Sequence, residues 1–310
     1  MHEHPLLQQG LQLLAIEWLS AKSTVTFLLG ILGAILLRKS LLGRRGSDKE
    51  QADALRLREE ILFRQPESSH LGECPICCLP VGLPGNQRKT TIYSCCGKVI
   101  CNGCAFAENM KQTTCPFCRQ PTPKSIEEAD KNLMKRGAVN DPVALWQMGT
   151  ICSYKKDYKG TFNYYKMAAE LGDVEAHYNL SKMYRKGLAV ERDATKEWYH
   201  LEEAAIRGHP KARYFLGAYE WNKDRYDRAV KHFIIAANLG HDESLQELKD
   251  CYKDGAVSKD DFAAALRSHQ AAVDATKSPQ REIAAKDEQR RKEIELSIHR
   301  GVDISNIGVW

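Results

Sequence analysis

The sequence predicts a mostly α-helical protein in which an α-solenoid of helix pairs follows a small cysteine-rich domain, with a hydrophobic helix near the N-terminus. Three observations support this fold class. Nine of the eleven cysteines lie between Cys74 and Cys118. A motif of two alanines and a glycine recurs along the second half of the chain. An uncharged and mostly apolar run lies between Lys22 and Arg38.

The cysteine-rich segment contains three C-x2-C pairs and, between the first and second of them, the adjacent cysteines Cys95 and Cys96. It reads C-P-I-C-C from residue 74, S-C-C-G-K-V-I-C-N-G-C from residue 94 and C-P-F-C-R from residue 115. Two thiolates on one tight turn converge on a single tetrahedral ion, whereas such pairs have poor geometry for a disulfide. Nine is an odd number, and eight thiolates fill two zinc sites. We therefore expect two structural zinc ions, which supply folding energy that a short segment lacks, rather than a disulfide knot.

The order of these pairs resembles the RING finger over residues 74–119. The resemblance implies that the first and third pairs share one zinc ion, and the second and fourth pairs share the other. The first site then consists of Cys74, Cys77, Cys101 and Cys104, and the second site of Cys95, Cys96, Cys115 and Cys118.

One departure from the commonest RING pattern concerns the second pair. That pattern has a histidine where this chain has Lys98, and an ammonium group cannot ligate zinc. The segment is therefore similar to the all-cysteine RING variant, which usually separates its third and fourth ligands by one residue. Here Cys95 and Cys96 are adjacent, so either both bind zinc, which we expect, or Cys78 replaces one of them.

A repeated motif organises residues 141–280. It occurs as Ala168-Ala169-x2-Gly172, as Ala204-Ala205-x2-Gly208, as Ala236-Ala237-x2-Gly240 and, without the glycine, at Ala271-Ala272. Apolar residues spaced four apart follow each glycine, which places them on one helix face. The alanines permit two helices to approach closely, and the glycine suits a left-handed helix end. Each unit is therefore expected to be a helix pair.

The units are 32, 36 and 32 residues long. Together with the junction of Gly and Ala four positions apart, they resemble Sel1-like repeats, which are relatives of the tetratricopeptide repeat. Plain tetratricopeptide repeats are the alternative, but their constant period of about 34 residues fits less well. Pro142 and Pro210 occupy the first turn of their helices, where a missing N–H costs nothing.

The first 47 residues contain a candidate membrane anchor at 23–42. The apolar run has only fifteen residues, whereas a helix that spans a bilayer needs about 20. The run approaches this length if the basic side chains that follow it snorkel toward the membrane surface. Those bases place the C-terminal bulk in the cytosol by the positive-inside rule. A cleaved signal peptide and an amphipathic helix packed on the protein are the alternatives; without an anchor the protein would be cytoplasmic.

The remaining segments connect these parts. Residues 48–73 are expected to form a charged helical linker that ends with a surface histidine, His70. Residues 120–140 are a connector with a helix that begins at the capping box of Ser125 and Glu128. Residues 281–310 form a charged C-terminal helix and tail.

The RING resemblance implies a function as an E3 ubiquitin ligase, which recruits a ubiquitin-charged conjugating enzyme while the repeats bind substrates or adaptors. Ile76 and Pro116 match the family's contacts to the conjugating enzyme, and Arg119 matches the arginine that bridges this enzyme and ubiquitin. The zinc ions would be structural, and no residue is catalytic. Against this reading, Glu108 stands where the family often has a large apolar residue.

The alternative function is a non-catalytic scaffold that uses the cysteine-rich domain and the repeats as protein-binding modules. Other classes have less support from the sequence. The net charge is only +5, and no basic recognition helix adjoins the cysteines, so we do not expect nucleic acid binding. No nucleophile–base pair or phosphate-binding loop suggests another enzyme class.

Overall fold

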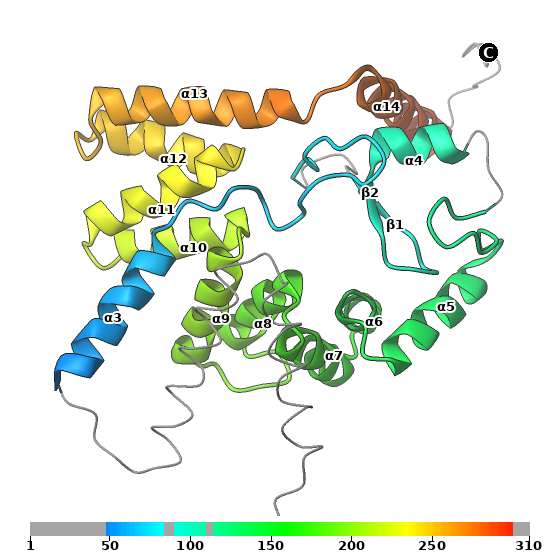
Figure 1. Ribbon diagram of the computed structural model, residues 1–310, viewed down its shortest axis with the longest axis horizontal. Helices are drawn as coiled ribbons and strands as arrows, with labels where there is room; N and C mark the ends of the chain where they lie inside the picture. Colours follow the sequence, from blue (N-terminus) through cyan, green and yellow to red (C-terminus); the bar gives the residue numbers. More distant parts are fainter. Residues whose placement is uncertain (1–47, 84–89, 110–113, 300–310) are drawn as a thin grey trace, which may run out of the picture. The chain divides into compact units, whose positions relative to one another are not determined.

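The computed structural model describes residues 48–83, 90–109 and 114–299. The chain divides into two compact units, residues 1–61 and residues 62–310. Helix α3 (Asp48–Leu62) is the described part of the first unit and runs to its boundary. The second unit holds both the cysteine-rich domain and the helical repeats (Figure 1).

The cysteine-rich domain has little regular structure. Strands β1 (Thr90–Ile92) and β2 (Val99–Cys101) pair antiparallel, with Thr91 opposite Ile100, and helix α4 (Asn102–Asn109) follows directly. Its buried apolar cluster contains Val81, Ile100 and Ala105, and the other fully covered members are cysteines. So few apolar side chains cannot supply a stable core alone.

Eight helices then form four antiparallel pairs, in agreement with the predicted α-solenoid (Figure 1). They are α6 (Pro142–Tyr154), α7 (Tyr158–Glu170), α8 (Val174–Lys186), α9 (Ala194–Ile206), α10 (Pro210–Trp221), α11 (Tyr226–Asn238), α12 (Asp242–Lys253) and α13 (Lys259–Ala275). Two further helices flank the array: α5 (Ile126–Ala138) precedes it and α14 (Pro279–His299) follows it.

The repeated motif acts as the sequence predicts. In the three copies that end in glycine the paired alanines are buried, whereas Ala271 is exposed and Ala272 is half-buried. The glycines that follow, Gly172, Gly208 and Gly240, have φ values of 88°, 83° and 83°, which side chains with a Cβ rarely adopt. Each glycine therefore ends one helix and turns the chain into the next pair.

The helix starts are fixed by side-chain caps. Ser125 accepts a hydrogen bond from the N–H of Glu128 at the start of α5, as the capping box predicts. Asp141 and Asp173 cap α6 and α8 in the same way. At α10 and α12 the caps are His209 and His241, whose rings accept from backbone N–H groups. The sequence analysis did not find these histidine caps.

The membrane prediction is corrected by the structure. Within 48–83, 90–109 and 114–299, no helix is both long and apolar enough to cross a bilayer. Helix α14 has 21 residues, but its sequence is rich in charged side chains. The localisation as a membrane-anchored protein is therefore wrong for this part of the chain, and the candidate anchor at 23–42 lies outside the described residues.

Candidate functional site

Three turns of the cysteine-rich domain share one backbone arrangement; we call them knuckles one (74–79), two (93–98) and three (115–120). In each knuckle the N–H of the fifth residue donates to the C=O of the first, at 2.8–2.9 Å. The N–H of the first residue donates to the C=O of the sixth, at 2.8–3.0 Å. The fifth residue has a positive φ in all three. These turns thus hold two of the three C-x2-C pairs, Cys74–Cys77 and Cys115–Cys118, and the adjacent pair Cys95–Cys96.

The knuckles explain the unusual spacing of the second pair. In knuckles one and three the cysteines occupy the first and fourth positions. Knuckle two begins with Tyr93, so its pair, Cys95 and Cys96, occupies the third and fourth positions. Cys78 occupies the fifth position of knuckle one, equivalent to Arg119 in knuckle three, and its side chain is exposed.

The structure brings the eight expected ligands together in two clusters. Within each cluster all ligand atoms lie within 4.8 Å of one another. The first cluster contains Cys74, Cys77, Cys101 and Cys104, and the second contains Cys95, Cys96, Cys115 and Cys118. Cys78 belongs to neither. The structure therefore gathers the interleaved sets that the resemblance implies, and their role as metal ligands stays a prediction.

The sulfur spacing fits a zinc ion. With Zn–S bonds of about 2.3 Å, tetrahedral sulfurs lie about 3.8 Å apart. The sulfurs of Cys77 and Cys101 are 3.8 Å apart, and those of Cys96 and Cys115 are 3.7 Å apart. A set of four thiolates also leaves no open position, so an ion bound there would hold structure and carry out no chemistry.

Electrostatics favour a cation in both clusters. Burial raises the pKa of the Cys104 thiol, and the neighbouring sulfur of Cys101 raises it further. Burial and adjacent sulfurs likewise raise the pKa of the Cys95 thiol. Several thiolates this close together repel one another unless a divalent cation offsets their charge. The N–H of Cys101, which donates to the sulfur of Cys74 at 3.4 Å, also supports a thiolate.

Two arginines from the helical part bind the knuckles. Arg281 of α14 donates to the sulfur of Cys77 at 3.4 Å and to the carbonyl oxygens of Leu79 and Pro80 at 3.2 and 2.6 Å. Arg136 of α5 donates to the carbonyl oxygen of Ser94 in knuckle two at 3.3 Å. The charged C-terminal helix is thus packed against the cysteine-rich domain, with its first turn close to α4 (Figure 1).

The residues expected to contact a conjugating enzyme lie on these same knuckles. Ile76 of knuckle one is 38% exposed. In knuckle three, Pro116 is half-buried and Arg119 is exposed. Their side chains are accessible, and their role stays a prediction.

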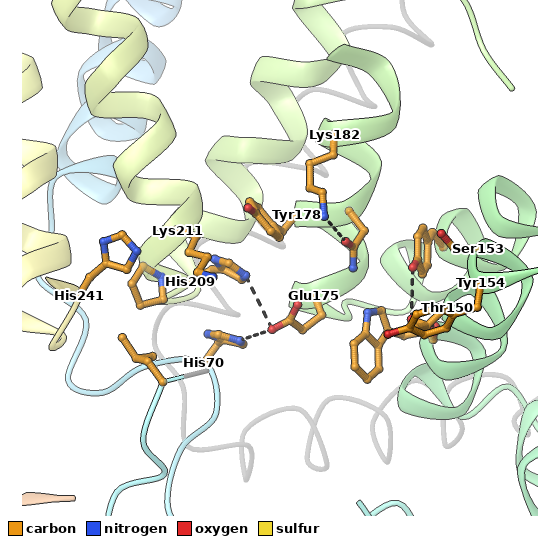
Figure 2. Close-up of a pocket in the computed structure, with 15 residues that line it drawn as sticks. His70, Thr150, Ser153, Tyr154, Glu175, Tyr178, Lys182, His209, Lys211 and His241 are labelled. Carbon is orange, nitrogen blue, oxygen red and sulfur yellow. Dashed lines mark hydrogen bonds and ion pairs between the residues drawn. The ribbon is translucent and has the colours of Figure 1, made fainter. Parts of the chain in front are cut away.

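A pocket of about 390 Å³ lies on the repeats, and we call it the repeat pocket (Figure 2). The first helices of successive pairs, α6, α8 and α10, supply most of its wall. It is lined by His70, Leu83, Trp146, Thr150, Ser153, Tyr154, Tyr165, Glu175, Tyr178, Asn179, Lys182, His209, Pro210, Lys211 and His241.

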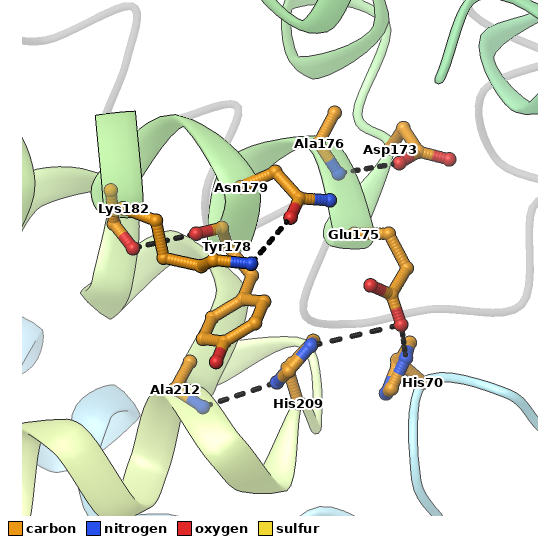
Figure 3. Close-up of polar contacts among 10 residues, drawn as sticks. His70, Asp173, Glu175, Ala176, Tyr178, Asn179, Lys182, His209 and Ala212 are labelled. Atoms are coloured by element: carbon orange, nitrogen blue, oxygen red, sulfur yellow. Dashed lines mark hydrogen bonds and ion pairs between the residues drawn. The ribbon is translucent and has the colours of Figure 1, made fainter. Parts of the chain in front are cut away.

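Glu175 is the centre of a buried polar cluster in this pocket (Figure 3). Its Oε1 lies 2.9 Å from Nε2 of His70 and 3.7 Å from Nε2 of His209. Burial opposes ionisation of Glu175, but the hydrogen bonds of the two histidines outweigh it and hold the pKa well below its ordinary value. The prediction that His70 is a surface histidine is wrong, because its side chain is only 5% exposed.

This cluster has the residue types of a metal site, yet its hydrogen bonds argue against one. Nδ1 of His209 accepts from the N–H of Ala212 at 3.1 Å, so a neutral His209 carries its proton on Nε2. A metal ion beside Glu175 would need the lone pair of that same Nε2. We therefore interpret the cluster as a set of polar contacts that hold the segment around His70 on the repeats.

Comparisons with known proteins identify the helical array. Residues 143–173, 174–209 and 210–241 each match the Sel1 repeat, so the prediction of Sel1 repeats is confirmed. No RING zinc-finger family was detected, so that resemblance stays a prediction. The chain is similar to DAP3-binding cell death enhancer 1 of Mus musculus, with 25% identity over 51% of this chain and 39% of that protein.

Two further proteins are similar to parts of this chain. The chitin synthase regulator SKT5 of Saccharomyces cerevisiae is 37% identical over 22% of this chain and 10% of that protein. The crystal structure of a Sel1 repeat protein from Oxalobacter formigenes aligns with a TM-score of 0.43 at 26% identity, covering 48% of this chain and 46% of that one. The chain thus spans well under half the length of these curated relatives.

Proposed function

From its three Sel1 repeats, we propose that this protein is an interaction scaffold, in which the repeat pocket binds a partner protein and two structural zinc ions hold the cysteine-rich domain. The repeat pocket is the observation that carries the proposal. Its walls come from three successive repeats, and Tyr154 at its edge is 85% exposed. Large aromatic side chains that remain accessible are enriched where proteins bind each other.

Two comparisons are consistent with a scaffold. By their names, one of these similar proteins binds DAP3 and the other regulates chitin synthase. In addition, the hydroxyl of Ser244 lies 2.8 Å from Nδ1 of His241 beside the pocket, but Ser244 is fully buried and that ring nitrogen caps α12, so the pair stabilises a helix start. A rigid array with a concave, aromatic pocket fits recognition better than catalysis.

The scaffold can be tested by site-specific photo-crosslinking in cells that express the full chain. A photoreactive phenylalanine analogue replaces Tyr154, and the control carries it at Leu266 of α13, which is 46% exposed and does not line the repeat pocket. We expect discrete crosslinked proteins from position 154 that are absent at position 266. Identical crosslinks at both positions, or none at position 154, would contradict the proposal.

Ubiquitin transfer is a second candidate function, favoured by the interleaved arrangement of the two cysteine clusters. Arg119 is exposed directly after the last ligand, so its guanidinium is available to bridge two proteins. Arg119→Lys keeps the positive charge and loses the planar fork, while Arg119→Ala loses both. We expect transfer to fall by about tenfold to several hundredfold in the alanine variant, because each 1.36 kcal/mol of barrier is about tenfold in rate.

The control for this assay is Arg267→Ala, an exposed arginine of α13. Zinc content should be unchanged in all three variants, since none removes a sulfur. If the parent chain shows no self-ubiquitination with a panel of conjugating enzymes, the ligase function is excluded and the scaffold alone remains.

A further inference from the structure

The repeat pocket holds two ammonium groups for which the described residues provide no carboxylate partner. Lys182 of α8 donates to the side-chain oxygen of Asn179 at 3.2 Å and lies 5.2 Å from the ring centre of Tyr178. Lys211 of α10 lines the same pocket (Figure 2). Neither lysine forms an ion pair with Asp or Glu within the described part of the chain.

The charges around Lys182 are mostly positive. Burial lowers the pKa of its ammonium group, and Lys186, Arg185 and Lys211 lower it further, while Glu175 acts in the opposite direction. An ammonium group that is partly removed from water and surrounded by like charges is stabilised by an incoming anion. The positive charges around Lys182 therefore favour the binding of an anion in the pocket.

The carboxylates near this pocket do not neutralise the two lysines. The charge of Glu175 is already engaged by His70 and His209 (Figure 3). Glu243 lies beside His241, with 3.2 Å between its carboxylate and Nε2 of that ring. Both acids are thus bound at the histidine side of the pocket, and the lysine side remains unneutralised.

The rest of the wall suits an apolar side chain next to the anion. Trp146, Tyr154 and Tyr178 line the pocket, and Tyr154 leaves most of its ring accessible. The indole N–H of Trp146 is buried without a hydrogen-bond partner, so it is a donor that still lacks an acceptor. Trp146 and the two lysines therefore offer donors, which match the acceptor oxygens of a carboxylate and of a peptide backbone.

We infer that the repeat pocket binds a short acidic segment of a partner protein, with a carboxylate between Lys182 and Lys211 and a neighbouring apolar side chain against Tyr154. This inference rests on the proposed scaffold function and adds the chemistry of the partner. A carboxylate fits better than a phosphate, because none of the described residues that line the pocket is an arginine, which would form the bidentate pair that phosphate favours. A dianion would also be repelled more strongly by Glu175.

The test measures binding of the full chain to two matched sets of fluorescent dodecapeptides. In one set Leu or Phe is flanked by Asp and Glu, and in the other the same positions carry Asn and Gln. We expect acidic peptides to bind at least tenfold more tightly than their amide counterparts, and their affinity to fall between 50 and 300 mM salt.

Two variants locate the site and one controls for charge. Lys182→Met and Lys211→Met keep the side-chain length and remove the charge, and the double variant should lose at least tenfold in affinity for the acidic peptides. Lys166→Met makes the same change on α7, at a lysine that is 61% exposed and outside the pocket, and should change affinity by less than twofold.

Three results would overturn the inference: no preference for the acidic set, no effect of the double variant, or complete displacement of the acidic peptides by inorganic phosphate at an affinity equal to theirs. The photo-crosslinking experiment separates this failure from that of the scaffold. Crosslinked partners at position 154 that persist in the double lysine variant would leave the scaffold intact and exclude the acidic segment. If the parent chain gave neither discrete crosslinks at position 154 nor a preference for the acidic peptides, both proposals would be rejected.

Discussion

The cysteine-rich domain and the repeats are stabilised in different ways within one chain. In the first, the buried residues include Cys74, Cys101 and Cys104, which are the expected metal ligands themselves. In the second, the core consists of leucines, aromatic rings and alanines, such as Leu180 and Phe233, which are 1% exposed. We therefore expect the cysteine-rich domain to depend on bound cations that the repeats do not need, although both belong to the same compact unit.

This difference predicts opposite responses to metal removal and to loss of apolar volume. A structural zinc site contributes about 10–16 kcal/mol of apparent binding free energy, which exceeds the whole stability of a typical domain. A single buried leucine contributes much less, but its loss affects only the array that it belongs to.

Cys101→Ser should remove one of two zinc ions and unfold the cysteine-rich domain, because an alcohol does not replace a thiolate ligand. Native mass spectrometry of the full chain gives the number of bound zinc ions. The matched control is Cys78→Ser, which changes a cysteine of knuckle one outside both clusters. Two zinc ions in the Cys101 variant, or the loss of one in the Cys78 variant, would contradict the assigned ligands.

Leu180→Ala should destabilise the repeats by about 2–5 kcal/mol, the usual range for a buried leucine that leaves a cavity. Urea unfolding followed by circular dichroism measures this change. Met167→Ala, at a position 41% exposed, should cost far less. Zinc content should be the same in both variants; a loss of zinc from the Leu180 variant would show that the two regions do not fold separately.

Arg281→Gln should weaken the first zinc site by about tenfold to a hundredfold, the usual effect of removing a group that hydrogen-bonds a metal ligand. The cause is the lost positive charge beside the sulfur of Cys77. Release of zinc to a chromogenic chelator should show one accelerated phase and one unchanged phase. Arg267→Gln on α13 is the control, and equal acceleration of both phases would argue against a local effect.

His232→Leu should reduce the acid sensitivity of the repeats. His232 is fully buried with neither ring nitrogen hydrogen-bonded, and burial lowers its pKa to about 2. Because its folded pKa lies below its unfolded value near 6.5, its contribution is present above pH 6.5 and is lost as the pH falls toward the folded pKa.

Between pH 7 and pH 5.5 this single histidine should account for about 1.3 kcal/mol of lost stability. Urea unfolding of parent and variant at both pH values measures the difference. An identical loss in the two proteins would mean that His232 is not kept neutral in the folded state.

The features that the sequence predicted correctly depend on short-range geometry. The paired alanines and Gly172 define a helix pair through contacts within one repeat, and Ser125 starts α5 through a bond three residues away. The turns that place Cys74 beside Cys77, and Cys115 beside Cys118, are each six residues long. Such features are encoded by spacing, so they can be read from the chain without knowing its tertiary contacts.

The features that the sequence analysis missed depend on residues far apart in the chain. His70 is buried because Glu175, more than a hundred positions away, accepts its hydrogen bond. Helix α14 packs on the cysteine-rich domain because Arg281 reaches knuckle one. Neither contact leaves a periodic signal. The membrane prediction rested on a run of only fifteen uncharged residues, shorter than a bilayer requires.

Hydrogen exchange of the full chain with and without a zinc chelator measures whether the cysteine-rich domain depends on bound metal while the repeats do not. We expect chelation to remove amide protection from residues 74–118 and from the first turn of α14, while helices α6 to α12 keep their protection. Loss of protection throughout the repeats would contradict it, as would a cysteine-rich domain whose protection does not change.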